Sequence, residues 1–581
     1  ARRIPRRGAT PPVVRARRPS LPEAGSLPRP WVRAYPPGVP PTYRLPDVAL
    51  PRFLDDAARD FPDRDALLVE GRTTSFVDLR DRVDRVATAL AAAGIGAGDR
   101  VLVALPLGEP APVVLFAVWR LGAVAVPVDP DTRADLLAGV ARDAAVAAAV
   151  GTRWALSSLQ GEDQAPEVVV EVRGDEWIRR RLRDRLPRPR LPDVRSGRGL
   201  RPAVPGDTVR LADLLTEETS GRRRPAGPSP SDPAVIAYRP RARELRGVVL
   251  SHANLVANAF QGRLWVPDVQ AGRERMLVTD PLHLTVPLTL GVLTGVLAAA
   301  TLILVDRPDA GELTATIERD RPTLWPTGPD RLTQLLGSSD RRRDLSSLRV
   351  IVTGGAPLSP QVAADVERRT GGARVREGYG LAEASPLTHA QPVYGRVADG
   401  SIGLPVTDTV ALLVEPDDLT TPVPPGTPGM LLVAGPQVAD GYWQREEATT
   451  STFRDGWLVT GDLATADEGG VYTLLGRASE VVRRDGELVA PHAVESVLVR
   501  HPSVLSAAVV TDDAGAQLLA GVVAAKRAKV DVEGLFAHCH ALLPPPAVPD
   551  HIELLDELPV DVVGQLDRDA LRRRLTGKGP S

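Results

Sequence analysis

Three side chains far apart in this chain are of types that together could hold a nucleoside. Tyr379 follows Gly378 where a strand-like pattern gives way to a loop, so its ring could stack on a flat base. Asp462 carries a carboxylate that can accept hydrogen bonds from two neighbouring hydroxyls. Arg477 can donate to sugar oxygens or to a phosphate. Taken singly, Tyr379 and Asp462 are better explained as ordinary core and turn residues.

Small residues at Gly354, Gly355 and Ala356 add to this set. Because their side chains are small or absent, a base could approach the main chain closely there. Such residues need a rigid framework, and from Leu50 onward short apolar strands alternate with amphipathic helices. The pattern predicts helices over Arg80–Ala93 and Ala111–Leu121 and strands over Arg100–Leu105 and Ala123–Val128. This rhythm is typical of an α/β fold with a parallel sheet covered by helices.

The later part of the chain changes character. Residues 398–475 contain short strands with turn signals and predict a β-rich subdomain. After Gly476 the sequence predicts a small α/β segment. Its elements are a helix over Pro491–Arg500, strands over Ser506–Thr511 and Gln517–Ala525, and a helix over Val532–Leu543.

Composition limits the classes of protein and the cellular compartments that suit this chain. The chain has 581 residues, too many for one ordinary core, so two or more domains are expected. The formal net charge of -2 gives no overall field that would favour nucleic acid. Cys539 is the only cysteine, so no disulfide can form within the chain, and a cytoplasmic location is the simplest interpretation.

Three segments bear on contact with a membrane. Residues 1–44, rich in Arg and Pro at their start, are interpreted as a disordered basic arm, either a solvated tail or an arm that docks on an anionic surface. Residues 284–305 are apolar enough to cross a bilayer, but Pro287 and two glycines favour a buried helix, a turn and a buried strand. Residues 177–186 predict a short helix with arginines on one side. That helix could be a foothold on anionic lipid or a solvated face, so a membrane-peripheral location stays open.

The segment 347–391 resembles the adenine-binding stretch of the adenylate-forming superfamily, and specifically of the long-chain fatty acid–CoA ligases. Further segments match motifs of that family in order: Gly400–Pro405, Gln437–Trp443, Gly456–Asp462, Gly476-Arg477 and Gly486–Pro491. The resemblance covers roughly residues 30–575. It implies a large α/β domain with a β-rich subdomain over residues 45–478, a hinge at Ser479, and a small α/β domain over residues 479–581.

The resemblance also implies an activity and a set of site residues. Members of this family join a carboxylate to AMP with release of pyrophosphate, and then pass the acyl group to coenzyme A. ATP, magnesium and coenzyme A are therefore implied. The nucleotide would contact Gly354, Gly355, Ala356, Tyr379, Asp462 and Arg477, since these residues occur together and in the family's order. Glu383 would hold magnesium, and His283 would border the acyl tunnel.

The family's phosphate loop, Y-T-S-G-T-T-G-x-P-K-G, is replaced in this chain. The corresponding residues are Tyr238, Arg239, Pro240, Arg241, Ala242, Arg243, Glu244, Leu245, Arg246 and Gly247. No glycine precedes Gly247, the Ser/Thr hydroxyls are gone, Pro240 lacks an N–H, and Glu244 brings a negative charge. Arg246 in place of lysine fits the scarcity of lysine in this chain. The arginines could instead grip an anion by their side chains.

Two further family residues are missing, and both belong to the adenylation step. Ala382 stands where the family carries threonine before Glu383. Gln565 stands at the position of the family's catalytic lysine, and glutamine cannot supply a positive charge between carboxylate and α-phosphate. The losses fall on one half-reaction, while Tyr379, Asp462 and Arg477 are kept. This pattern favours a protein that has shed ATP activation.

We therefore expect a ligase-like pseudoenzyme that binds an acyl chain, AMP, an acyl-adenylate or an acyl-CoA, and that acts alone or as a partner subunit. The first alternative is an active fatty acid–CoA ligase with an unusual phosphate loop. The second is an enzyme that performs only the acyl transfer to coenzyme A.

Overall fold

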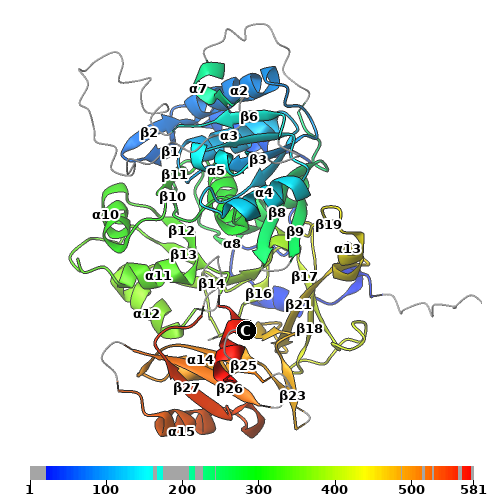
Figure 1. The fold of residues 1–581 in the computed structure, drawn as a ribbon, viewed down its shortest axis with the longest axis vertical. Helices are drawn as coiled ribbons and strands as arrows, with labels where there is room; N and C mark the ends of the chain where they lie inside the picture. Colours follow the sequence, from blue (N-terminus) through cyan, green and yellow to red (C-terminus); the bar gives the residue numbers. More distant parts are fainter. Residues whose placement is uncertain are drawn as a thin grey trace, which may run out of the picture.

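The computed structural model describes residues 21–160, 166–173, 208–215, 227–241, 244–356, 358–398, 400–485, 487–512, 517–525, 529–559 and 566–577. Within these residues two large sheets, of eight and nine strands, form the upper body of the molecule (Figure 1). A five-stranded sheet lies beside them, and a smaller unit with a three-stranded sheet lies at the lower end. The chain is thus the mixed α/β protein that the sequence predicts.

The eight-stranded sheet has the order β19-β9-β8-β4-β3-β5-β6-β7. Its strands are β3 (Arg100–Ala104), β4 (Val124–Pro127), β5 (Ala148–Gly151), β6 (Val168–Glu171), β7 (Val209–Arg210), β8 (Pro233–Arg241), β9 (Glu244–Ser251) and β19 (Gly441–Tyr442). The strands β3 to β6 are mutually parallel, as the alternation of strands and helices predicts. Helix α2 (Phe76–Ala92) begins at Ser75, whose hydroxyl accepts a hydrogen bond from the Asp78 N–H, and α3 (Pro110–Arg120) begins with proline. Both ends of this sheet are strands of two residues.

The nine-stranded sheet has the order β16-β15-β14-β13-β12-β10-β11-β1-β2. Its strands are β1 (Asp65–Val69), β2 (Arg72–Ser75), β10 (Arg275–Val278), β11 (Thr301–Leu304), β12 (Leu324–Thr327), β13 (Val350–Thr353), β14 (Arg374–Gly380), β15 (Leu387–Ala390) and β16 (Leu404–Pro405). Strands β12, β13 and β14 are parallel, so their carboxyl ends meet at one edge. Helices α10 (Ala310–Asp320), α11 (Pro329–Leu336) and α12 (Pro360–Arg369) pack on one face of this sheet.

The main hydrophobic core joins residues from both large sheets. Helices α1 (Pro51–Asp60), α2, α3 and α8 (His252–Trp265) contribute to it. The apolar stretch 284–305 also lies here, as a π-helix (Pro287–Leu293), helix α9 (Thr294–Leu297), a turn and strand β11. The predicted buried helix, turn and strand are therefore confirmed. Among the described residues, no helix is long and apolar enough to span a bilayer.

The interpretation of residues 1–44 as a disordered arm is wrong for the part that the structure describes. Residues 21–44 contain two short 3-10 helices, Ala24–Ser26 and Pro30–Ala34. Leu21 and Trp31 are only 6% and 3% exposed, and the Tyr35 hydroxyl donates to the Pro405 main-chain oxygen at 2.6 Å. These apolar side chains anchor the segment, and the abundance of Arg and Pro concealed this anchoring in the sequence. Residues 1–20 lie outside the described part.

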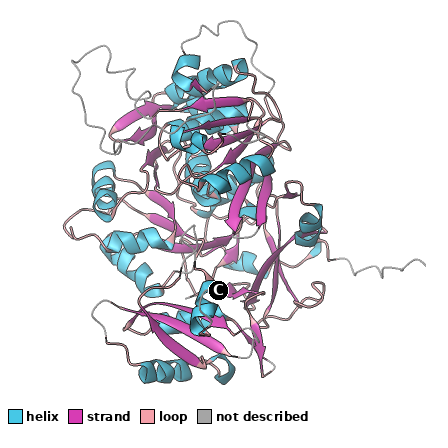
Figure 2. Ribbon diagram, in the orientation of Figure 1, coloured by secondary structure: helices cyan, strands magenta, loops and turns pink. Residues whose placement is uncertain are grey.

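The β-rich subdomain comprises β17 (Val410–Val414), β18 (Gly429–Ala434), β20 (Phe453–Arg454), β21 (Trp457–Ala466) and β22 (Tyr472–Arg477). The C-terminal unit comprises β23 (Val482–Arg484), β24 (Glu487–Val489), α14 (Pro491–Val499), β25 (Val504–Thr511), β26 (Leu518–Ala524), α15 (Val532–Leu542), β27 (His551–Leu555) and α16 (Arg568–Leu575). Its strands and helices separate clearly from those of the two large sheets (Figure 2). The predicted elements of this unit are present within one or two residues, and β27 and α16 complete it. The predicted surface helix at 177–186 and Gln565 lie outside the described residues.

Candidate functional site

Tyr379, Asp462 and Arg477 meet at one point. Tyr379 comes from β14, and the other two face each other across the antiparallel pair of β21 and β22. The Tyr379 hydroxyl donates to Oδ2 of Asp462 at 2.6 Å, and Nε of Arg477 lies 3.1 Å from Oδ1. Asp462 is 4% exposed. Burial, followed by the negative charge of Asp462, raises the pKa of Tyr379 well above its usual value. The structure therefore brings these three predicted residues together around one buried carboxylate.

The small residues Gly354, Gly355 and Ala356 follow β13, the strand that pairs with β14. A side chain at Gly354 would put its Cβ 2.6 Å from the main-chain oxygen of Gly378. Gly355 has φ +90°, a conformation that favours glycine. Glycine at these positions thus lets the end of β13 lie against the strand that carries Tyr379, and it leaves main-chain atoms open to a flat ligand.

Glu377 lies one residue before Gly378, in register with Thr353 of β13, and was not singled out from the sequence. Burial raises the pKa of its carboxyl to about 7, although the Leu358 N–H and the positive charge of His492 act in the opposite direction. His492 belongs to α14 of the C-terminal unit. The available signal was an acidic residue directly before the Gly378-Tyr379-Gly380 motif.

Glu383 lies in a short 3-10 helix, Ala382–Ala384, beyond the end of β14. Its Oε1 accepts a hydrogen bond from the Tyr442 hydroxyl at 2.9 Å. The guanidinium of Arg246 lies 5.9 Å from the centre of the Tyr442 ring, on its face. The Tyr442 ring thus lies between the carboxylate of Glu383 and the guanidinium of Arg246 and contacts both. A magnesium ion would be held by the remaining oxygen of Glu383 together with oxygens of a ligand, a donor set that this metal accepts, and it would neutralise negative charge there.

The segment expected to be the phosphate loop is a β-hairpin over its described residues. Strands β8 and β9 pair without a gap from Tyr238↔Gly247 to Arg241↔Glu244 (Figure 1). The Tyr238 hydroxyl donates to Oδ2 of Asp143 at 2.7 Å, which fixes the base of this segment. A side chain at Gly247 would meet Ile236 at 2.5 Å and the Tyr238 ring at 2.8 Å. This glycine therefore serves strand packing.

A small, partly open apolar cavity lies between α8, the π-helix with α9, and strands β12, β13 and β15. Its lining comprises Gly262, Arg263, Trp265, Val266, Val269, Met276, Leu290, Thr294, Ala298, Leu324, Trp325, Pro326, Val350, Val352, Leu387 and Ala390. Strands β13 and β15 flank Tyr379 on either side of β14. Two of the strands that line the cavity are thus the neighbours of the strand that carries Tyr379.

His283 is not among the residues that line this cavity. It follows β10, its Nδ1 is buried without a hydrogen-bond partner among the described residues, and burial lowers its pKa. Asp129 and Arg307, which form an ion pair at 2.5 Å, supply the charges near it. Its assignment to the acyl pocket stays a prediction.

Ser479, the predicted hinge, is exposed and lies two residues after Arg477. The next residue, Glu480, pairs with Arg568 of α16 at 3.3 Å. Arg568 also binds Glu495 of α14, with Nη1 2.6 Å from Oε1. The chain is thus tied to the C-terminal unit from Glu480 onward, and the hinge at Ser479 stays a prediction.

Comparisons with known proteins connect these features. The sequence model of the family described as "AMP-binding enzyme" matches residues 54–443, and that of the "AMP-binding enzyme C-terminal domain" matches residues 493–564. A long-chain-fatty-acid–CoA ligase of Bacillus subtilis is 32% identical over 561 residues, covering 94% of this chain and 97% of the relative. A ligase of the same description from Yersinia pestis is 30% identical, covering 93% and 97%.

Solved structures agree on the fold. A crystal structure of an anthranilate CoA ligase in complex with anthranoyl-AMP has a TM-score of 0.78 at 21% identity, covering 92% of this chain and 98% of that one. The family models match both the large unit and the C-terminal unit, and the relatives span nearly the whole length. The chain belongs to the AMP-binding, adenylate-forming enzyme family and is similar to its long-chain fatty acid–CoA ligases.

Proposed function

We propose that this protein binds an acyl group and an adenosine phosphate ester and has lost ATP-dependent adenylation. The observation that carries the proposal is the β8–β9 hairpin, paired as far as Arg241↔Glu244 at the position of the phosphate loop. In an antiparallel ladder the main-chain N–H groups alternate between the partner strand and the outside. They cannot all converge on one phosphate, as the N–H groups of a glycine-rich loop do.

The single glycine of this segment does not reopen the hairpin. Gly247 faces Ile236 and the Tyr238 ring, where any side chain would collide. Its main-chain oxygen accepts a hydrogen bond from the Trp443 N–H at 2.7 Å. The base of the hairpin is thus fixed by side-chain packing and by a main-chain hydrogen bond. This supports the proposal that the segment no longer forms a phosphate-binding loop.

The residues that would hold the remaining part of the ligand support binding. A nucleoside would replace or share the hydrogen bonds of Asp462, whose two oxygens already accept from Tyr379 and Arg477. The apolar cavity is lined by residues of β13 and β15, the two neighbours of the strand that carries Tyr379, and would receive the acyl chain. Such a protein would act as an acyl or nucleotide sensor, or as the partner subunit of an active ligase.

The active-ligase alternative is favoured by one observation. The Arg246 guanidinium on Tyr442, and the Tyr442 hydroxyl on Glu383, form a charged path beside the hairpin. If Arg246 alone could hold the departing phosphates, the cradle would be unnecessary.

Pyrophosphate exchange with a panel of fatty acids separates the two functions. We expect no exchange by the natural protein and measurable binding of a non-hydrolysable acyl-adenylate. The matched variant rebuilds residues 239–244 as a Gly- and Ser/Thr-rich loop with one residue inserted, because this segment is one residue shorter than the family's phosphate loop. Robust exchange by the natural protein would refute the proposal, and loss of that exchange in Arg246→Met would identify the cation. Thioester formation from a supplied acyl-adenylate detects the enzyme that performs transfer alone.

A further inference from the structure

An arginine-rich loop connects α11 with β13. It lies at the edge of the nine-stranded sheet where the parallel strands begin, opposite the edge near Tyr379. This arginine loop, residues 340–344, precedes the amino end of β13, whereas Gly354 follows its carboxyl end. Strand β13 has four residues, so the two places are on the order of ~13 Å or more apart. The loop is therefore distinct from the site around the buried carboxylate.

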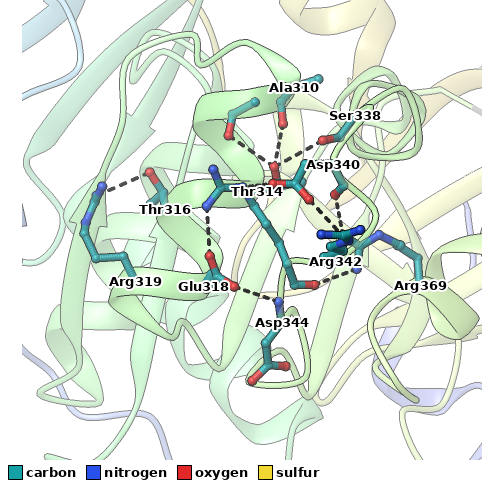
Figure 3. A network of polar contacts seen from close by, with 12 residues as sticks. Ala310, Thr314, Thr316, Glu318, Arg319, Ser338, Asp340, Arg342, Asp344 and Arg369 are labelled. Atoms are coloured by element: carbon teal, nitrogen blue, oxygen red, sulfur yellow. Dashed lines mark hydrogen bonds and ion pairs between the residues drawn. The ribbon is translucent and has the colours of Figure 1, made fainter.

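The main chain of the arginine loop is fixed from both sides. Arg369, the last residue of α12, donates from Nη2 to the Asp340 oxygen at 3.2 Å and from Nη1 to the Arg343 oxygen at 3.0 Å (Figure 3). From α10, the Oε1 oxygen of Glu318 accepts a hydrogen bond from the Asp344 N–H at 3.1 Å. These contacts hold the positions from which the loop side chains project.

The carboxylates around the loop are already engaged. Arg343 binds Glu318 at 2.8 Å and lies 3.3 Å from Asp340. Arg321 binds Asp344 at 3.0 Å. Three carboxylates thus serve two arginines and several main-chain N–H groups.

Three arginines remain without an acidic partner in this part of the described chain. Arg341 and Arg342 are exposed, and neither has a side-chain hydrogen bond or ion pair among the described residues. Arg369 donates only to main-chain oxygens, and its Nε is buried without an acceptor. Burial, and then the positive charge of Arg341, lower the pKa of Arg369, while the negative charges of Asp340 and Glu318 act in the opposite direction. An isolated exposed arginine is normally solvated. Arg369 is instead partly buried near Arg341, and no carboxylate of the described residues forms an ion pair with it.

We propose that the arginine loop and Arg369 form a binding site for a phosphate group, carried by a soluble phosphorylated compound or by a phosphomonoester lipid headgroup. Guanidinium groups match the geometry and charge of phosphate oxygens, and each additional charge-assisted contact strengthens the site. Because the main chain is already fixed, binding would need to order only the ends of Arg341 and Arg342. Both sources present the same doubly charged group.

The test measures binding to the full chain in phosphate-free buffer at low ionic strength. Calorimetric titrations use inorganic pyrophosphate, and co-sedimentation uses phosphatidylcholine vesicles with and without phosphatidic acid. The double variant Arg341→Ser/Arg342→Ser keeps the main-chain N–H that Arg342 donates to Asp340. The control Arg33→Ser/Arg72→Ser removes two exposed arginines elsewhere and makes the same change in net charge.

We expect the loop variant to bind at least tenfold more weakly than the control to one of the two probes, with unchanged thermal unfolding. Weakening toward pyrophosphate identifies a soluble ligand, and weakening toward phosphatidic acid alone identifies a lipid headgroup. Arg341→Lys/Arg342→Lys should recover part of the affinity, because it restores the charge. The proposal is overturned if neither probe binds the natural protein, or if the loop variant and the control bind equally.

Discussion

Substitution of Glu377 by glutamine should stabilise the protein at pH 8 and change little at pH 4.5. The pKa of this carboxyl is raised from 4.5 to about 7, mainly by burial. Between these values the folded protein binds a proton that the unfolded chain releases, so stability falls as pH rises from about 4.5 to 7 and is level above. A shift of one pKa unit corresponds to 1.36 kcal/mol, which gives an upper value of about 3 kcal/mol for the two and a half units. Glutamine does not ionise, so the stability of the variant lacks this dependence on pH.

Urea unfolding of the natural protein and of Glu377→Gln, at intervals from pH 4.5 to 8, measures this difference. Glu468→Gln, an exposed position in the β-rich subdomain, is the control and should give a flat difference. The positive charge of His492 lowers the pKa of Glu377, so the two variants are also compared in a His492→Asn background. A Glu377→Gln effect that does not grow between pH 4.5 and 7 in either background would refute the assignment of a raised pKa.

Three further outcomes follow from contacts already described. Tyr379→Phe removes the 2.6 Å hydrogen bond to the buried carboxylate of Asp462 and should lower the free energy of unfolding by about 1–3 kcal/mol. Denaturant titration measures this loss, and an unchanged midpoint would mean that Asp462 finds another donor. Arg568→Met removes the arginine from Glu495, which keeps the Val509 N–H and His492, and should destabilise the C-terminal unit by about 1.5–3 kcal/mol. Hydrogen exchange of the amides in that unit measures this loss, and exchange at the natural rate would contradict the ion pair's role. Gln565→Lys alone should not produce pyrophosphate exchange. It restores a positive charge worth on the order of 10²–10³ in rate, but not the glycine-rich loop that binds the phosphates. Exchange in that variant would show that the hairpin does not block ATP.

Much of the fold was predictable because its signals are local. The alternation of β3, α3 and β4 is written in short apolar runs and helical spacing, and the structure has these elements within a residue or two of the prediction. The segment 284–305 was also interpreted correctly, since its proline and glycines do not suit a continuous span. By contrast, Trp31 lies in a Pro- and Arg-rich stretch, and its burial depends on packing against distant Tyr472.

The candidate site was predictable in its members and not in its contacts. The order of motifs pointed to Tyr379, Asp462 and Arg477, but sequence cannot show that one carboxylate serves the other two. Tyr442 was quoted as part of a motif, and its bond to Glu383 depends on β19 pairing with β9. The sequence predicts a loop at this place because it shows only that the glycines are missing. The pairing of β8 with β9 depends on contacts between the two strands, which the missing glycines do not reveal.

The two-residue strands at both ends of the eight-stranded sheet have a consequence for behaviour at high concentration. A long, flat edge strand exposes a row of unpaired N–H and C=O groups that can recruit a strand of another molecule. Here β7 and β19 each offer two residues, too few to template a stable intermolecular ladder. At these two ends, the apolar parallel strands of the eight-stranded sheet are therefore kept from edge-to-edge association with another molecule.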